Sequence, residues 1–398
     1  MRRVLLILIV LLGVASVFGC YGSLRKEGQQ PEEALREART FFLKFQDDMD
    51  MDSLMQALRR NIEYLRRLAP ETVFRYGPHE FTCQQVRESQ EAFLSLISKG
   101  LDSDQLSREI KKKFRVYRAS GRGGNGQVLF TGYYEPVYEG RLSPDETFRY
   151  PLYRSPDDLV RIDLSPFGEK FKGEAIVARI EGKKVLPYYS RSQIEMEGVL
   201  AGKGLEMLWL KDPLDVAFLH IQGSGRVRLI DDKELRVQYR SSNGRPYRSI
   251  GRYMMEKGFL TREGMSMQAI RKYLAENPGI RDEVLNYNPS YVFFRQTEVG
   301  PSGSIGVLLT SGRSVALDSK LFPKGGLGFI SCRKPLVNDQ GVITGWTKFS
   351  RFVLNQDTGG AIKGPGRADL FWGSGSYAEL AAGNLQHDGV LYILIKKP

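Results

Sequence analysis

The spacing of apolar residues divides the chain into a helical start and a strand-rich remainder. In residues 31–68, Leu54, Leu58, Ile62 and Leu65 recur at helical spacing, which predicts one helix with Asp52 or Ser53 available to cap its start. This apolar stripe is typical of core packing, and helical signals continue to about Lys113. From Phe114 onward the pattern changes to short alternating runs broken by glycines, which is typical of strands and hairpins.

Several strands and helices are predicted within this second part. RVYRASGRGGNGQVLFTGYY is expected to form a strand, a Gly-rich hairpin turn and a second strand. Residues 216–219 and 227–230 flank the polar QGSGR turn and predict another hairpin, whereas 249–260 and 266–276 predict helices. After Tyr291 the expected strands are VFFR, IGVLL, SVAL, GLGFIS, FSRFVL and GVLYILI. The chain is therefore predicted to be mainly β with added helices.

The first twenty residues have the pattern of a processing signal. Arg2 and Arg3 precede an apolar run that is too short for a transmembrane helix, which needs about 20 residues. The sequence VFGC then resembles a lipoprotein cleavage box, so we predict a signal at 1–19, a lipid on Cys20 and a polar tether at 20–31. The alternative is an ordinary secretory signal in which Cys20 has no role.

Charge and cysteine content narrow the choice of partners. Lys and Arg number 58 against 46 Asp and Glu; without Arg2 and Arg3 the numbers are 56 and 46, a surplus of 10. Such a surplus either favours an acidic partner or serves solubility alone. No C-x-x-C or paired-His spacing occurs, so we predict no metal ion, and Cys83 and Cys332 are the candidates for a disulfide.

The segment 355–375, NQDTGGAIKGPGRADLFWGSG, carries the chemistry that is most suggestive of function. Asp357 and Asp369 flank a Gly-rich turn, and Phe371 and Trp372 follow. A sugar-cleaving site needs a carboxylic acid to protonate the glycosidic oxygen, and aromatic faces to stack on a pyranose. Such a stretch taken alone is more often a plain tight turn.

The segment resembles the C-terminal three-aspartate domain of the membrane-bound lytic murein transglycosylase A family, whose aspartates fall on Asp318, Asp357 and Asp369. Further motifs match that family in order: FTGYYEPVYEG, YPLYRSPDDL, LPYYSRSQIE, LDVAFLHIQGSGRVRL, SSNGRPYRSIGRYM and NPSYVFFR. The resemblance covers most of the chain from about residue 130. It implies a double-psi β-barrel interrupted by a second, inserted β-barrel, with the active groove between them. Mapped here, the insert spans 134–290, and 32–133 with 291–398 form the first barrel.

The resemblance also implies a chemistry. A lytic transglycosylase cleaves between N-acetylmuramic acid and N-acetylglucosamine, and the muramyl C6 hydroxyl attacks its own anomeric carbon to form a 1,6-anhydro ring. One residue then acts first as acid and next as base. That residue is Asp369 by resemblance, with a pKa raised by burial beside Phe371 and Trp372. No cofactor is expected.

Other site assignments follow with their alternatives. Asp357 is either a turn residue or a group that polarises Asp369, and Asp318 is expected to be structural. Thr131 is expected to bond substrate or Asp369, and of Tyr133 and Tyr134 at most one faces the groove. The remaining candidates are Gln222 and Ser224, as sugar contacts or a plain turn, and Glu135, as a rival carboxylate.

Two other functions remain open from the sequence. A two-carboxylate β-glycan hydrolase would use Asp357 with Asp369, and an expansin-like wall-binding protein would grip glycan without cleaving it. The expected partner is peptidoglycan, whose stem peptides carry carboxylates, rather than nucleic acid. We expect a monomer on the periplasmic side of the outer membrane, anchored through Cys20.

Overall fold

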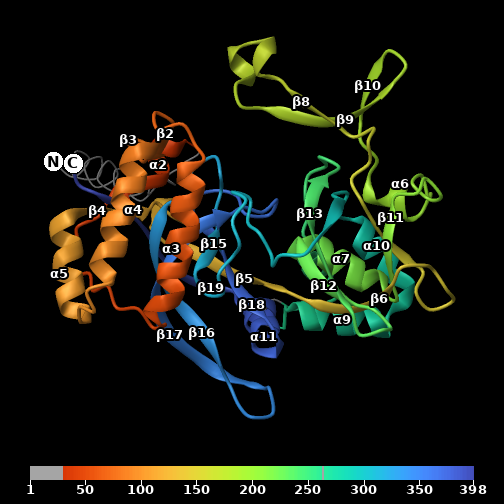
Figure 1. Ribbon diagram of the computed structural model, residues 1–398. Helices are drawn as coiled ribbons and strands as arrows, with labels where there is room; N and C mark the ends of the chain where they lie inside the picture. The colour runs from red at the N-terminus through yellow and green to blue at the C-terminus, as the bar shows by residue number, and fades with distance from the viewer. Residues whose placement is uncertain (1–29, 262–263) are drawn as a thin grey trace, which may run out of the picture.

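The computed structural model describes residues 30–261 and 264–398 and shows two β domains joined by a long strand (Figure 1). The expected signal at 1–19, Cys20 and the tether as far as residue 29 lie outside the described residues. Within the described part of the chain, no helix is long and apolar enough to cross a membrane.

The N-terminal region is built from short elements that cover one side of the first barrel. Its helices are α2 (Pro31–Ala34), α3 (Met51–Arg66), α4 (Cys83–Ile97) and α5 (Ser103–Lys113), and its strands are β1 (Leu35–Glu37), β2 (Val73–Tyr76) and β3 (His79–Thr82).

The prediction of a single helix over 31–68 is wrong, because residues 35–37 form a strand that pairs with residues 117–119 instead. The following loop brings Asp47 to Arg313, where both side chains are fully buried. Helix α3 therefore starts only at Met51, with Asp50 as its cap in place of Asp52 or Ser53: the Asp50 carboxylate accepts the Ser53 backbone N–H at 2.7 Å.

The first domain is a closed barrel of six strands. In order around the barrel they are β5 (Val128–Glu135), β18 (Arg367–Ser374), β15 (Ser314–Ala316), β17 (Ile343–Asp357), β16 (Leu327–Val337) and β19 (His387–Lys396). Strand β19 pairs back with β5, which closes the barrel. Strand β4 (Phe114–Ala119) lies outside this ring and pairs with β19 and β1, and α11 (Ser376–Asn384) connects β18 to β19.

Two sequence expectations for this domain are wrong. Strands β4 and β5 form as predicted but do not pair as a hairpin, because β19 hydrogen-bonds to both. IGVLL forms a turn with one isolated bridge, Ser302–Leu308, instead of a strand. In addition, ADLFWG belongs to β18, a strand that the glycine-rich sequence did not predict.

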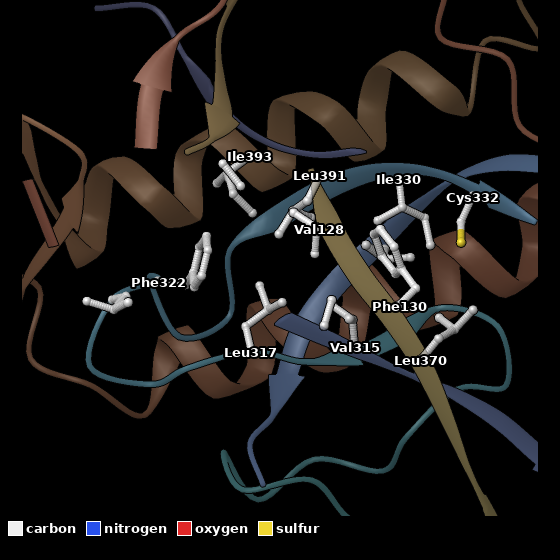
Figure 2. Close-up of a cluster of buried hydrophobic side chains, with 14 of the residues drawn as sticks. Val128, Phe130, Val315, Leu317, Phe322, Ile330, Cys332, Leu370, Leu391 and Ile393 are labelled. Atoms are coloured by element: carbon white, nitrogen blue, oxygen red, sulfur yellow. The ribbon is translucent and has the colours of Figure 1, made fainter. Parts of the chain in front are cut away.

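The barrel interior is filled by alternate side chains of these strands. Figure 2 shows Val128 and Phe130 of β5 facing Val315, Ile330, Leu370 and Leu391, which come from β15, β16, β18 and β19. All of these side chains are at most 1% exposed. Since neighbouring residues of a strand point to opposite faces, Thr131 and Asp369 are directed away from this core.

The inserted domain is a second curved sheet with helices. Its strands lie in the order β14 (Val292–Thr297), β13 (Glu234–Ser242), β12 (Ser224–Arg228), β6 (Val137–Arg141), β11 (Glu206–Leu210) and β7 (Tyr150–Tyr153). A bridge between Arg154 and Phe294 brings the two edge strands together. Its helices are α6 (Arg191–Glu195), α7 (Pro213–Gln222), α8 (Ile250–Glu256), α9 (Met267–Glu276) and α10 (Arg281–Asn286).

A three-stranded arm projects from this domain (Figure 1). It consists of β8 (Val160–Asp163), β9 (Ala175–Glu181) and β10 (Lys184–Pro187).

The strand expected at 216–219 is helical. Asp212 accepts the Leu214 backbone N–H, Pro213 occupies the first turn, and Gly223 ends α7 with a φ of 76°. These are the start and stop signals of a helix, and they decide the structure of a short apolar run that is compatible with either a strand or a helix. The expected end of the insert at Ser290 also shifts, because β14 pairs with β13 of the inserted sheet. The chain therefore returns to the first barrel after Thr297.

Candidate active site

Asp369 and Thr131 lie side by side on two parallel barrel strands. They are register partners in β18 and β5, and the Thr131 hydroxyl donates to Oδ1 of Asp369 at 2.6 Å. Ala368 and Leu370 on either side of Asp369 are fully buried, whereas Asp369 itself is only half-buried. The strand thus fixes the carboxyl group at the barrel surface, and the expected bond between Thr131 and Asp369 is confirmed.

Asp357 lies across a neighbouring strand from Asp369. Both aspartates are register partners of Ala316 in β15, Asp357 from β17 and Asp369 from β18. Two strand spacings separate their α-carbons, or about 10 Å. The intervening Ala316 side chain is a single methyl group, so the space above it is left to the two carboxyl groups.

Three donors hold the Asp357 carboxylate in place. Oδ1 accepts the backbone N–H groups of Ser304 and Thr358, both at 2.9 Å. Oδ2 accepts the hydroxyl of Tyr133, also at 2.9 Å. The N–H of Thr358 is the turn contact expected from sequence, but the other two donors come from distant segments. The Asp357 side chain is therefore held both by its own turn and by two segments that are distant in the sequence.

Burial raises the pKa of both carboxyl groups. The pKa of Asp357 rises to about 6, because burial and the nearby Asp369 outweigh its three hydrogen bonds. Burial also raises the pKa of Asp369, against the Thr131 hydroxyl and the positive Arg367. The pKa of Tyr133 is raised well above its ordinary value by burial and by Asp357, so its phenol stays protonated as a donor. A proton can thus be retained on one carboxyl near neutral pH.

The two aromatic residues after Asp369 are both buried, so neither offers the open stacking face that was expected. Phe371, at 3% exposed, packs on Tyr133 with ring centroids 5.2 Å apart, in a small cluster with Ala316 beneath the carboxyl groups. Trp372 points to the opposite face of β18, is 7% exposed and packs in the barrel core against Phe349. Phe371 contributes to the apolar surroundings of the site, and Trp372 supports the strand from the other side.

Gln222 and Ser224 lie at the junction of the domains and are buried. The Gln222 side-chain oxygen accepts the Tyr134 backbone N–H at 2.9 Å, and its amide faces the sulfur of Met267 at 3.3 Å. Ser224 begins β12 and is 7% exposed. Gln222 therefore ties helix α7 to strand β5 three residues beyond Thr131, which is a positioning contact that the sequence analysis did not anticipate.

The other two carboxylates considered from sequence have separate partners. Oδ2 of Asp318 accepts the Gly364 backbone N–H at 2.8 Å, which ties the segment after β15 to the loop between Asp357 and Asp369, in keeping with a structural role. Glu135 faces Arg226 at 3.4 Å within the inserted domain, and burial raises its pKa against that charge.

Cys83 and Cys332 are both free and buried, so the disulfide that the sequence left open does not form. Across residues 30–261 and 264–398, no group of three or more His, Cys, Asp or Glu side chains could hold a metal ion.

Sequence reasoning missed Tyr247 and Arg367 as neighbours of Asp369. Tyr247 belongs to the SSNGRPYRSIG motif of the inserted domain. Burial raises the pKa of its phenol, the positive Arg367 lowers it, and the carboxylate of Asp369 raises it. A Cβ atom placed on Gly360 would lie 3.6 Å from the Cβ of Tyr247, so Tyr247 reaches the loop between the two aspartates. The motif was visible in the sequence, but nothing in it indicated which residue crosses to the barrel.

Comparison with known proteins matches this arrangement. Residues 129–295 match the family described as "MltA specific insert domain", and residues 313–395 match the "3D domain". Membrane-bound lytic murein transglycosylase A of Vibrio cholerae is 35% identical over 287 residues, covering 71% of this chain and 70% of the relative. This chain belongs to the membrane-bound lytic murein transglycosylase A family. The family, the function of a peptidoglycan lytic transglycosylase and the double-psi barrel architecture, all expected from sequence, are thereby confirmed.

Solved structures of family members agree over nearly the whole chain. The membrane-bound lytic murein transglycosylase from Agrobacterium tumefaciens superposes with a TM-score of 0.74 at 31% identity, covering 91% of this chain and 98% of that one. Escherichia coli MltA with bound chitohexaose gives a TM-score of 0.66 at 25% identity, covering 94% and 98%. The two-domain arrangement is therefore that of the family.

Proposed function

We propose that Asp369 is the acid and then the base of the transglycosylase reaction. One observation supports this assignment above the others: among the described residues, Thr131 bonds Oδ1 of Asp369, while Oδ2 has no protein partner. Burial raises the pKa of Asp369, which favours the protonated form, and Oδ2 is free to carry that proton. Asp357 lacks such a free oxygen, because both of its oxygens accept protein donors.

The proposed steps balance without water. Asp369 gives its proton to the glycosidic oxygen as the bond from that oxygen to the muramyl anomeric carbon breaks. The ionised Asp369 then takes the proton of the muramyl C6 hydroxyl as its oxygen bonds the same anomeric carbon. Asp369 ends protonated, as it began. The nucleophile belongs to the substrate, which makes the attack intramolecular and favours it over attack by solvent.

A two-carboxylate hydrolase is less compatible with this geometry. Such an enzyme needs a second carboxylate that is open to a water molecule or to the sugar. The Asp357 carboxylate is instead held by Tyr133 and two backbone N–H groups. We propose that Asp357 acts through its charge, which opposes ionisation of Asp369 until the substrate is bound.

We propose that the glycan strand passes over Asp369 between the barrel and the inserted domain. The E. coli relative was solved with chitohexaose, which supports an oligosaccharide as the ligand. Tyr247 reaches the loop between the two aspartates from the inserted domain, and we propose that it contacts the sugar. Gln222, Ser224, Phe371 and Trp372 shape the site from buried positions in this proposal, whereas Thr131 and Tyr133 orient the carboxyl groups.

We also propose that a lipid on Cys20 holds the protein on the periplasmic face of the outer membrane as a monomer. The support is the Gly19-Cys20 box behind the apolar run, together with relatives named as membrane-bound. Stable anchoring by lipid requires more than one acyl chain or a second contact. A Cys20→Ser chain should be released from the membrane fraction, and unchanged fractionation and lipid labelling would contradict the attachment.

The catalytic assignment is tested by two matched substitutions. Asp369→Asn keeps size but removes the transferable proton, and should lower the turnover of purified murein by about 10²–10⁴-fold. Asp357→Asn, a change of the same kind on the neighbouring strand, should retain partial activity. Both variants should melt cooperatively and sediment with murein. If a folded Asp369→Asn protein keeps more than about a tenth of the parent rate, Asp369 is not the acid, and Asp357 or Glu135 becomes the next candidate.

A further inference from the structure

Two adjacent phenylalanines project from the loop between β1 and α3. Phe41 is 81% exposed and Phe42 is 92% exposed, and their rings meet edge to face with centroids 4.8 Å apart. Phe45, three residues later, is fully buried, and its backbone N–H donates to the Ser107 hydroxyl at 2.9 Å. The base of the loop is thus fixed to α5, while its two largest apolar side chains face outward. Exposure of such rings to water is unfavourable, and a pair of exposed aromatic rings is typical of a contact surface.

Lysine side chains lie at the base of this loop and beside it in the chain. The Lys111 ammonium donates to the Phe41 carbonyl at 3.0 Å, and Lys397 donates to the carbonyl of Lys111 at 3.0 Å. Lys112 follows in the last turn of α5, and Lys44 follows Phe42 by two residues in the loop. The ion pair of Lys44 with Asp104 is exposed on both sides, so screening leaves it weak. The surface combines an apolar tip with a basic rim.

We propose that this surface, formed by Phe41, Phe42, Lys44, Lys111 and Lys112, docks on a bilayer that contains anionic phospholipids. Phenyl rings enter the boundary between headgroups and acyl chains, and lysines approach the phosphates. A water-soluble protein partner would also cover apolar rings, but the basic rim and the position in the chain favour the bilayer.

The position of the loop in the chain supports a bilayer as the occupant. Helix α2 begins at Pro31, so at about 3.4 Å per residue the proposed lipid on Cys20 lies within roughly 40 Å of it. Helix α5 lies on the opposite side of the barrel from the inserted domain (Figure 1), so docking leaves that domain directed away from the bilayer. Only the reach of the tether rests on the proposed lipid attachment; the surface itself can be tested without it.

The experiment uses the processed chain, starting at position 20 and carrying Cys20→Ser, which keeps every residue that the structure describes. Its binding to phosphatidylcholine vesicles is measured by sedimentation with and without phosphatidylglycerol. We expect binding that requires phosphatidylglycerol. The Phe41→Ser/Phe42→Ser variant should bind the vesicles at least about tenfold more weakly. The single variants Lys44→Gln and Lys112→Gln should each bind about fivefold more weakly.

A matched control separates this loop from other exposed apolar residues. Phe167 is 70% exposed on the arm of the inserted domain, and Phe167→Ser should bind vesicles like the parent. Thermal melting should be unchanged in all variants, because the replaced side chains are exposed. Murein turnover should be unchanged as well, because none of them belongs to the strands that carry Asp357 and Asp369. Absence of binding to anionic vesicles would overturn the proposal. So would parent-like binding of a folded Phe41→Ser/Phe42→Ser variant, an equal loss in Phe167→Ser, or self-association of the parent through these phenylalanines in place of vesicle binding.

Discussion

Replacing Tyr133 by Phe removes a single hydroxyl group and leaves the ring in its packing against Phe371. The lost hydrogen bond to Oδ2 of Asp357 is 2.9 Å long and stabilises the ionised carboxylate. A hydrogen bond to a charged group contributes about 1.5–3 kcal/mol, and 1.36 kcal/mol corresponds to one pKa unit. The pKa of Asp357, already raised to about 6, should therefore rise by about 1–2 further units. At neutral pH the variant would carry a protonated Asp357 and lose the charge that opposes ionisation of Asp369.

The assay is the rate of soluble muropeptide release from purified murein, measured from about pH 4 to about pH 9. Activity that depends on an ionised Asp357 falls as pH decreases through the Asp357 pKa, so Tyr133→Phe should move this acid limb to higher pH. Thr131→Val is the matched control, because it removes the hydroxyl that stabilises ionised Asp369. In this variant the pKa of Asp369 should rise, and the alkaline limb of the pH profile should move to higher pH, while the acid limb stays in place. If Tyr133→Phe leaves the acid limb in place while the protein remains folded, Asp357 does not act through its charge.

Three further predictions concern stability. Gln222→Ala leaves the buried Tyr134 N–H without its acceptor and should lower the free energy of unfolding by about 1–3 kcal/mol in urea titrations; a change below about 0.3 kcal/mol would contradict the junction role. Asp47→Ala strands the buried Arg313 charge and should cost about 3–5 kcal/mol in the same titration, with a near-neutral result refuting the importance of this ion pair. The proton on Asp357 stabilises the fold fully below about pH 4, and this stability, up to about 3 kcal/mol, is lost as pH rises through about 6. Asp357→Asn should flatten that pH dependence, and an unchanged slope would show that Asp357 does not cause it.

The sequence was sufficient for features that depend on local signals or on several motifs in order. The stripe of Leu54, Leu58 and Ile62 correctly indicated α3, and the helix predicted at 266–276 matches α9 closely. Alternation along β5 correctly separated Tyr133 from Tyr134, because period-two alternation follows from strand geometry alone.

The features that the sequence could not supply depend on contacts between distant segments. Leu35 has good helical neighbours, but the edge of β4 offered it backbone hydrogen bonds that ended the helix. Asp47 gave no local signal because its partner, Arg313, lies 266 residues away. The burial of Trp372 follows from its position in β18, and the glycines around ADLFWG concealed that strand. Tyr247 is brought to the loop between Asp357 and Asp369 by packing of one domain on the other, which no pattern within its own segment encodes.

In the proposed reaction, Asp369 directs the muramyl C6 hydroxyl, and not water, to the anomeric carbon. Mass analysis of the products released from purified murein tests this most directly, since a 1,6-anhydro end is lighter than a reducing end by one water. We expect anhydro ends throughout from the parent protein, and essentially no product of either kind from a folded, murein-binding Asp369→Asn variant. Reducing ends from the parent, or anhydro products formed by Asp369→Asn at a rate near that of the parent, would contradict the proposed reaction.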